Sequence, residues 1–135
     1  MKAIDLVKQD KFAAFLGIEI EDYAPGYAKV SLKTDERFLN GIDRIQGGAT
    51  YTMADFAFAV AVNAAADEME GVACAVSMST SATFLRAGEM GMLFAEAKEV
   101  SKNKTIGHYD VIVTNAAGEV ILVFNGVAYF KKQRK

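Results

Sequence analysis

The stretch NGIDRIQGGATYTMADFAFAVAVNAAADEM, residues 40–69, sets the centre of the fold. From about Ala49 to Ala66 it is apolar on nearly every side, which predicts a helix buried in a core rather than one with a single buried stripe. Asp55 lies in the middle of this helix, and its neighbours one turn away include no Lys or Arg. A buried carboxylate without a partner is costly, so Asp55 needs a compensating interaction or a function.

The segments on both sides of this helix carry other periodic patterns. Residues 5–16, followed by Gly17, predict a short amphipathic helix, and two alternating runs on either side of Pro25-Gly26 predict a β-hairpin. Four further strands are predicted after the long helix, at residues 72–85, 92–101, 105–115 and 119–131. The intervals between strands hold no helices for parallel crossovers.

We therefore expect one α+β domain over residues 1–135, with a mostly antiparallel sheet wrapped around one long central apolar helix. The sheet can cover only one side of such a helix. Its remaining apolar surface needs another partner, and a second subunit is the natural candidate.

Composition narrows the classes of partner. The chain is 52% hydrophobic with a net charge of -2, so it lacks the basic excess that nucleic acid binding requires. Cys74 is the only cysteine, which excludes an internal disulfide and fits a reducing compartment. Residues 1–17 lack the apolar core of a signal peptide, and residues 53–66 are short for a bilayer. We expect a cytoplasmic protein with no membrane or nucleic acid partner, and no cluster of side chains has metal-ligand spacing.

The start of the long helix offers hydrogen-bond donors. Gly47 and Gly48 let the backbone approach a ligand, and the first amides of a helix have no intrahelical acceptor. Such amides suit a carbonyl oxygen that becomes an oxyanion, although a tight turn would also explain the two glycines. Asp55 likewise has two interpretations: a solvated or hydrogen-bonded aspartate, bonded for example to Thr52, or a general base or nucleophile in a half-dry pocket.

Gly47 and Asp55 are too far apart to act together within one chain. Asp55 follows Gly47 by eight residues, which is about 12 Å along a helix axis. Acyl chemistry needs the donor and the base within about 3 Å of the same atoms. Two antiparallel helices from two subunits could satisfy this requirement. If the protein is an enzyme, the spacing predicts a homodimer with two shared sites.

These residues resemble those of the hot dog fold acyl-CoA thioesterases, in particular the phenylacetate-degradation, PaaI-like branch. That branch typically reads N-G, then H-G-G, then A-D-x-A-x-A, and the resemblance extends from Phe15 to Gly126. The matching positions are Asn40-Gly41, Gln46-Gly47-Gly48, Ala54-Asp55, Asn63, Thr83 to Ala87, Gly107-His108-Tyr109 and Asn115 to Gly118.

The resemblance implies hydrolysis of an acyl-CoA thioester, with coenzyme A as part of the substrate and no further cofactor. By position, Asp55 corresponds to the carboxylate that activates water or attacks the carbonyl, and the backbone N–H of Gly47 to the donor that polarises the carbonyl. Asn40 and Ser77 correspond to polar residues near the attacking water. The family's sites are shared between subunits, and homotetramers are common in it.

One residue departs from the family in a way that bears on chemistry. Gln46 stands where the family has a histidine. Both side chains donate a hydrogen bond to a carbonyl or thioester sulfur, but glutamine cannot carry a proton. We expect reduced turnover if the histidine protonates the leaving thiolate. The alternative is a non-catalytic acyl-CoA-binding or sensing protein on the same fold. Ala87 replaces a family proline, which affects only the expected loop geometry.

The remaining candidates concern the substrate. Arg86 and Lys104 are candidate partners for the phosphates of coenzyme A, or else solvated surface cations. Gly48 and Phe84 are expected to contact the substrate, and the apolar content permits aryl or medium-chain acyl groups. His108 is the only histidine and is interpreted as structural, which argues against a dehydratase. The sequence leaves open which acyl group is used and how a tetramer packs.

Overall fold

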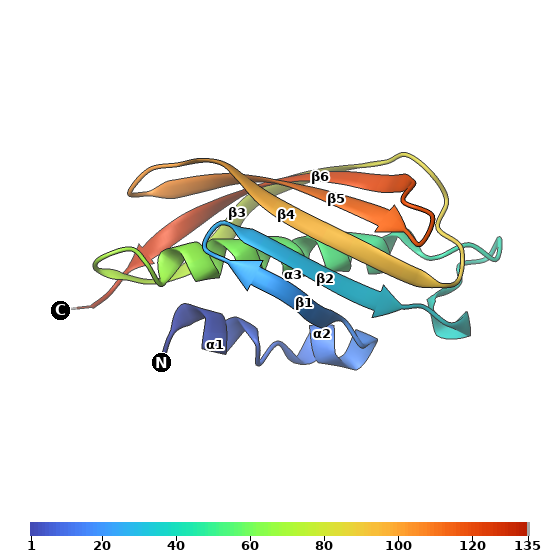
Figure 1. Ribbon diagram of the computed structural model, residues 1–135, viewed down its shortest axis with the longest axis horizontal. Helices are drawn as coiled ribbons and strands as arrows, with labels where there is room; N and C mark the ends of the chain where they lie inside the picture. The colour runs from blue at the N-terminus through green and yellow to red at the C-terminus, as the bar shows by residue number, and fades with distance from the viewer. Residues whose placement is uncertain (135) are drawn as a thin grey trace.

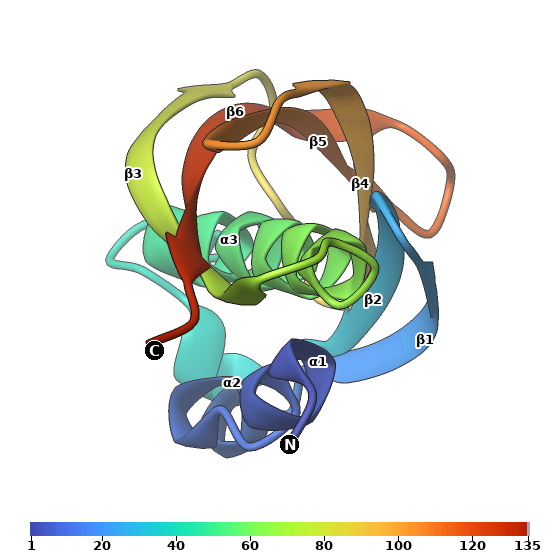
Figure 2. The same cartoon turned by 90° about the vertical axis from the view of Figure 1, so that its left-hand side faces the viewer.

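The computed structural model describes residues 1–134 as one antiparallel sheet curved around a long helix (Figure 1). The strands are β1 (Glu19–Ala24), β2 (Tyr27–Lys33), β3 (Val72–Phe84), β4 (Met92–Lys102), β5 (Ile106–Asn115) and β6 (Val120–Lys132). They lie in the order β1-β2-β4-β5-β6-β3, and every neighbouring pair is antiparallel. The end-on view shows helix α3 (Gly47–Ala66) in the hollow of the sheet (Figure 2). The predicted hot dog fold is confirmed.

Helix α3 is buried by aromatic packing against the strands. Phe58 is 1% exposed and lies between Tyr109 on β5 and Phe124 on β6, with ring centroids 5.6 and 5.9 Å apart. Gly126 on β6 makes room for this ring, since a Cβ there would lie 2.8 Å from Phe58 Cε2.

The helix begins at Gly47, two residues before the predicted start at Ala49. No helix within residues 1–134 combines the length and apolarity needed to cross a membrane.

One stripe of α3 remains partly accessible. Its members are Gly48, Tyr51, Thr52, Asp55 and Ala59. These positions are three or four residues apart, so they share one face of the helix. The carboxylate of Asp55 therefore lies on the open stripe and not among the fully buried side chains.

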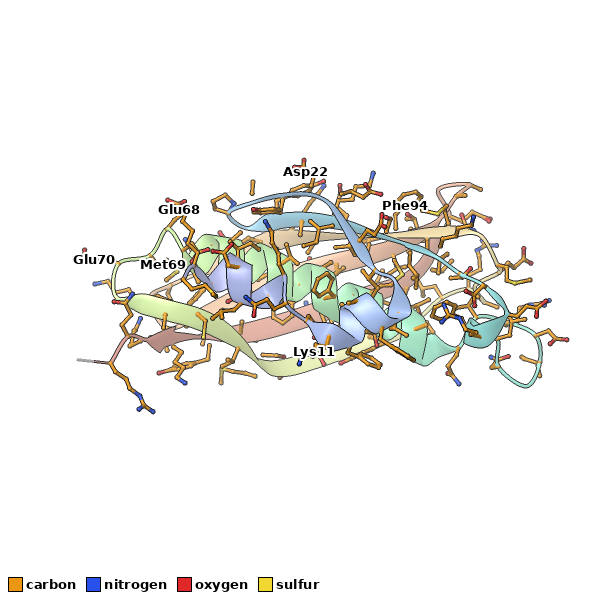
Figure 3. All side chains as sticks on the ribbon, turned by 90° about the horizontal axis from the view of Figure 1, so that it is seen from below. Lys11, Asp22, Glu68, Met69, Glu70 and Phe94 are labelled. Atoms are coloured by element: carbon orange, nitrogen blue, oxygen red, sulfur yellow. The ribbon has the colours of Figure 1, made fainter. Side chains whose placement is uncertain are left out.

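The N-terminal segment forms two helices, so the single helix predicted over residues 5–16 is wrong. These are α1 (Ala3–Val7) and α2 (Lys11–Leu16), and the break falls at Asp10. The Oδ1 atom of Asp10 accepts a hydrogen bond from Ala13 N at 2.9 Å, which starts a new helix there. Figures 2 and 3 show both helices lying along α3 on the open side of the curved sheet. The chain itself thus covers part of the surface of α3 that we had assigned to a second subunit.

The side chain of Asp67 holds the N-terminal segment in place. It follows the last residue of α3, and its Oδ1 and Oδ2 atoms accept hydrogen bonds from Ala3 N at 2.6 Å and Ile4 N at 3.0 Å. A carboxylate at the first amides of a helix satisfies donors that have no intrahelical acceptor. The first helix is therefore tied to the end of the central one.

Strand β3 is an edge of the sheet. It pairs with β6 on one side only, and it is thirteen residues long. Its exposed apolar side chains include Val76 and Met78, which are 46% and 61% exposed. A long apolar edge strand presents unpaired backbone groups that can pair with another chain.

Candidate active site

Asp55 has an unusual environment for a carboxylate. It is half-buried, and within residues 1–134 it makes no hydrogen bond or ion pair. Burial raises the pKa of its carboxyl, and repulsion from Asp10 adds to this effect. The expected alternative of a bond to Thr52 is wrong, because Thr52 Oγ1 donates to the carbonyl oxygen of Gly48 at 2.7 Å. The carboxylate is left free to bind a ligand or a water.

The backbone N–H of Gly47 also lacks a hydrogen-bond partner within residues 1–134. Gly47 is the first residue of α3, and its N–H has no acceptor in the part of the chain that the structure describes. The next amide, Gly48 N, donates to Gln46 Oε1 at 3.4 Å. A Cβ at Gly47 would lie 2.9 Å from Phe84 Cε1, so only glycine lets the Phe84 ring lie against this amide.

A groove of about 290 Å³ runs past this helix start. Four predicted site residues line it: Asn40, Gly47, Phe84 and Arg86. Asp55 is not among its lining residues, and it lies on the same helix as Gly47, eight positions further on. Within one chain, the predicted hydrogen-bond donor, the amide of Gly47, therefore lies in this groove, and the carboxylate of Asp55 lies outside it.

Asn40 organises the loop that forms one wall of this groove. Its Oδ1 atom accepts hydrogen bonds from Ile42 N at 3.0 Å and Arg44 N at 3.1 Å. The loop also holds Asp43 at a φ of 58°, in the left-handed region. Because its oxygen is used internally, only the amide Nδ2 of Asn40 remains available to a substrate or water.

Gln46 caps α3 with its own side chain. Its Oε1 atom is occupied by the N–H of Gly48, so the Nε2 amino group is the part that remains free. The residue is exposed. The side chain that replaces the family histidine is thus oriented as a donor, the one role in which it can replace a neutral imidazole.

The other predicted residues are spread over the chain. Ser77 is exposed on β3, opposite Ala128 of β6 and next to a bulge. Arg86 pairs through Nη1 with Glu119 Oε2 at 3.1 Å. Lys104 lies in the β4–β5 turn, at the opposite end of the molecule from the start of α3 (Figure 1). Within one chain the structure does not bring Lys104 near Arg86.

His108 lies on the outer face of the sheet. Its neighbour Tyr109 points inward to Phe58, so strand alternation turns His108 away from α3. Its Nε2 atom is buried and has no hydrogen-bond partner in the described residues. Residues 1–134 contain no group of three His, Cys, Asp or Glu side chains placed to hold a metal ion.

Two polar residues outside the groove at the start of α3, Asn63 and Asp10, were not predicted as part of the site. Asn63 is 3% exposed, and it exchanges hydrogen bonds with Ala75 N at 2.9 Å and Ala75 O at 3.3 Å, which fixes β3 to α3. Asp10 lines a second groove together with Ala59 and Asn63. The only sequence signal for Asp10 was an aspartate just before an apolar helical run, which is an N-cap pattern.

Comparison with known proteins agrees with this architecture. Residues 44–122 match the family described as the thioesterase superfamily. The acyl-coenzyme A thioesterase PaaI of Escherichia coli strain K12 is 32% identical over 125 residues, which cover 92% of this chain and 85% of that protein. The chain belongs to the thioesterase superfamily and is a thioester hydrolase.

Solved structures show which members of the superfamily this chain resembles. The structure of the E. coli PaaI protein from the phenylacetic acid degradation operon has a TM-score of 0.86 at 31% identity, covering 96% of this chain and 90% of that one. A hypothetical thioesterase from Streptococcus pneumoniae, solved with coenzyme A, has a TM-score of 0.84 at 25% identity, covering 98% and 100%. The resemblance to the PaaI-like branch is confirmed.

Proposed function

We propose that this protein hydrolyses aryl- or medium-chain acyl-CoA to the free acid and coenzyme A, at two sites shared between the subunits of a homodimer. The observation that carries the proposal is the separation of two free groups on one helix. The Asp55 carboxylate and the Gly47 amide both lack partners within residues 1–134. They are eight residues apart, about 12 Å along the axis. Each needs its counterpart from a second chain.

In this mechanism Asp55 of one subunit removes a proton from a water, and the water oxygen attacks the thioester carbon. The N–H of Gly47 of the partner subunit stabilises the oxyanion that forms on the carbonyl oxygen. The C–S bond then breaks, coenzyme A leaves as a thiolate, and the thiolate is protonated from solvent or from Asp55. Direct attack by Asp55, followed by hydrolysis of the anhydride, uses the same groups. In either route the free amide of Gln46 donates to the carbonyl or the sulfur.

The free edge of β3 supports this assembly. Two β3 edges related by a two-fold axis would pair antiparallel and continue the sheet from one subunit into the next. Such pairing would lay the two α3 helices side by side and bury Val76 and Met78. Ser77, on the same strand, and Asn40 would then lie near the attacking water, with Gly48, Phe84, Arg86 and Lys104 as candidate substrate contacts. A homotetramer would be two such dimers, and the single thiol of Cys74 fits a cytoplasmic enzyme.

The first test is release of free thiol from a panel of acyl-CoAs by the wild type and by Asp55→Asn. We expect the variant to lose about 10²- to 10⁴-fold in kcat, the usual contribution of a general base. Its unfolding free energy should not fall, because Asp55 makes no hydrogen bond or ion pair within residues 1–134 and its ionisation is disfavoured by burial. Undiminished turnover in the folded variant would remove Asp55 from the mechanism.

The second test asks whether the sites are shared. Asp55→Asn and Gly47→Val are each expected to be inactive as homodimers. After unfolding and refolding together, half of the dimers are mixed, and each mixed dimer has one site with both residues intact. We expect about a quarter of the wild-type activity to return. No recovery in a sample shown to contain mixed dimers would mean that each chain carries its own site.

The alternative function is a non-catalytic acyl-CoA binder, and the observation in its favour is that Gln46 cannot carry a proton. It predicts that acyl-CoA raises the melting temperature of the wild type while no thiol is released. The same acyl-CoA panel therefore separates the two functions.

A further inference from the structure

Tyr51 joins the open stripe of α3 to the edge strand β3. Its hydroxyl is hydrogen-bonded to Oγ1 of Thr80, and its ring packs edge-on against Phe124 on β6, with ring centroids 5.4 Å apart. Tyr51 and Thr80 are both partly buried. These two contacts fix the tyrosine ring between the helix and the sheet, so residue 51 of α3 lies beside residue 80 of β3.

Tyr51 is also the midpoint between the two groups that the proposed function brings together. It follows Gly47 by four residues and precedes Asp55 by four, which is about 6 Å along the helix axis from each. In a two-fold dimer, if residue i faces residue j of the partner, then j faces i. An axis that brings Gly47 of one chain to Asp55 of the other therefore places Tyr51 opposite its own copy.

The free edge of β3 has a midpoint that can be found without reference to the site. At the start of the strand, where α1 lies against it, Val72–Ala75 are buried or partly buried. From Val76 to Phe84 every residue is exposed or partly exposed. Figure 2 shows this strand at the edge of the sheet beside α3. Two copies of residues 76–84 that pair antiparallel over their full length are centred on Thr80, four residues from either end.

The composition of this segment suits pairing with a second copy of itself. Residues 76–84, VSMSTSATF, contain no charged residue and no proline. Edge strands that remain unpaired are usually protected by such residues. At the centre, Thr80 opposite its own copy is a favourable cross-strand pair. The occupant that this edge fits is therefore the same strand of another chain.

We propose that Tyr51 and Thr80 form a positioning pair on the two-fold axis of the dimer, where Thr80 pairs with its own copy and its hydrogen bond to Tyr51 sets the place of α3 relative to that axis. The inference rests on the proposed function, because the shared sites supply the midpoint of the helix. The midpoint of the strand comes from exposure alone, and the Tyr51–Thr80 hydrogen bond joins the two. Without this bond the helix can shift along the strand, which moves Asp55 away from Gly47 of the partner subunit.

The first test is disulfide cross-linking in a Cys74→Ala background, which removes the native thiol. Residues directly opposite in an antiparallel pair have Cα atoms about 4.5–5.5 Å apart, within the range of a disulfide. We expect oxidised Thr80→Cys to become a covalent dimer. Ser79→Cys and Ser81→Cys are the matched controls. Each would lie two residues out of register with its own copy, more than about 8 Å away and beyond the reach of a disulfide.

Each other outcome of the cross-linking has a defined meaning. Stronger cross-linking at residue 79 or 81 would mean a different register and would overturn the inference. So would the absence of a cross-link at all three positions in a sample that sedimentation shows to be dimeric, or a monomeric wild type. If Thr80→Cys does not fold, the double variant Ser79→Cys/Ser81→Cys replaces it, since these two positions would face each other across the axis.

The second test measures whether the hydrogen bond positions the sites. Tyr51→Phe and Thr80→Val each remove one hydroxyl and keep the shape of the side chain. We expect kcat to fall by about two- to tenfold in each, the fold-change that one net hydrogen bond supplies, with KM unchanged. The double variant should be no slower than the single ones, because both remove the same bond. A merely structural role would lower the melting temperature and leave kcat of the folded protein as it is.

Two further variants complete this test. Thr80→Ser keeps the hydroxyl and should retain the wild-type kcat. Thr114→Val is the matched control, since Thr114 is a partly buried threonine on β5 whose hydroxyl makes no hydrogen bond within residues 1–134. If Thr80→Cys cross-links while the wild type releases no thiol, the proposed function fails and the symmetric pairing stands. If the wild type is active and Tyr51→Phe has the same kcat, the positioning role is overturned and the proposed function stands.

Discussion

Replacing Gly47 by alanine tests the helix-start donor with little effect on folding. The added Cβ would lie 2.9 Å from Phe84 Cε1 and 3.3 Å from Cζ, so the ring must move. Phe84 is 56% exposed, and its ring can turn away at a cost of about 0.5–1.5 kcal/mol for a less favourable rotamer. The smaller backbone entropy of alanine offsets about 0.4–1 kcal/mol of this. We therefore expect the unfolding free energy to change by less than about 1 kcal/mol.

The effect on activity should be much larger. The displaced ring moves within the groove that Asn40, Gly47 and Arg86 line, where we place the thioester. The new methyl group would also lie beside the amide that we propose to polarise the carbonyl. Removing one oxyanion donor typically lowers kcat by about 10²–10³-fold. The amide remains here but is obstructed, so we expect kcat/KM to fall by about 10²-fold, at the lower end of that range.

Thiol release and urea denaturation measure the two effects side by side. Gly41→Ala is the control, since a Cβ at Gly41 meets nothing within 4 Å and its φ is not positive. It should keep activity to within about twofold, as for a typical surface substitution. The double variant Gly47→Ala/Phe84→Ala removes the clash and should recover part of the loss relative to Gly47→Ala. If Gly47→Ala is as active as Gly41→Ala, the Gly47 amide does not polarise the substrate.

Two further substitutions test stability and proton transfer. Asn63→Leu keeps the branched shape of the side chain but leaves the N–H and C=O of Ala75 without the Asn63 partner, so we expect a loss of about 2–4 kcal/mol in the unfolding free energy from urea denaturation. A loss below about 1 kcal/mol would show that β3 is held in another way. Gln46→His restores a group that can carry a proton, and we expect kcat to rise by about tenfold, less than a full general acid contributes because the thiolate leaves readily. An unchanged kcat would mean that protonation of the thiolate does not limit turnover.

The strands were predictable because their signal is local. Alternation located each of β3 to β6 to within one or two residues, and Pro25-Gly26 marked the hairpin correctly. The N-terminal helix was predicted as one element because the apolar spacing continues through residues 5–16. The structure breaks it at Asp10, where a capping bond to Ala13 N competes with continuation of the helix. The start of α3 was placed late because Gly47 and Gly48 have low helix propensity and Gln46 is not among the usual caps.

Residues of the candidate site could be predicted only where they belong to a short sequence motif. Asn40, Gly47, Phe84 and Arg86 line one groove because two loops meet at the same end of the sheet. The groove that Asp10 shares with Ala59 and Asn63 depends on how the N-terminal helices pack against α3, and no periodic pattern encodes that packing. The exchange of hydrogen bonds between Asn63 and Ala75 is likewise a long-range contact. It becomes visible only when helix and strand are placed together.

The partial burial of Asp55 explains why a core helix can carry a carboxylate. The raised pKa means that the folded chain binds a proton to Asp55 more tightly than the unfolded chain does. Between the two pKa values the unfolding free energy therefore falls as pH rises, so a charged Asp55 opposes folding. Deeper burial would keep the group protonated and inactive at neutral pH, whereas full exposure would hydrate it and weaken the base. The open stripe of α3 lies between these limits. The free amide of Gly47 is about 12 Å from Asp55 along the helix axis, so the base that we propose can meet this donor only if a second chain supplies it.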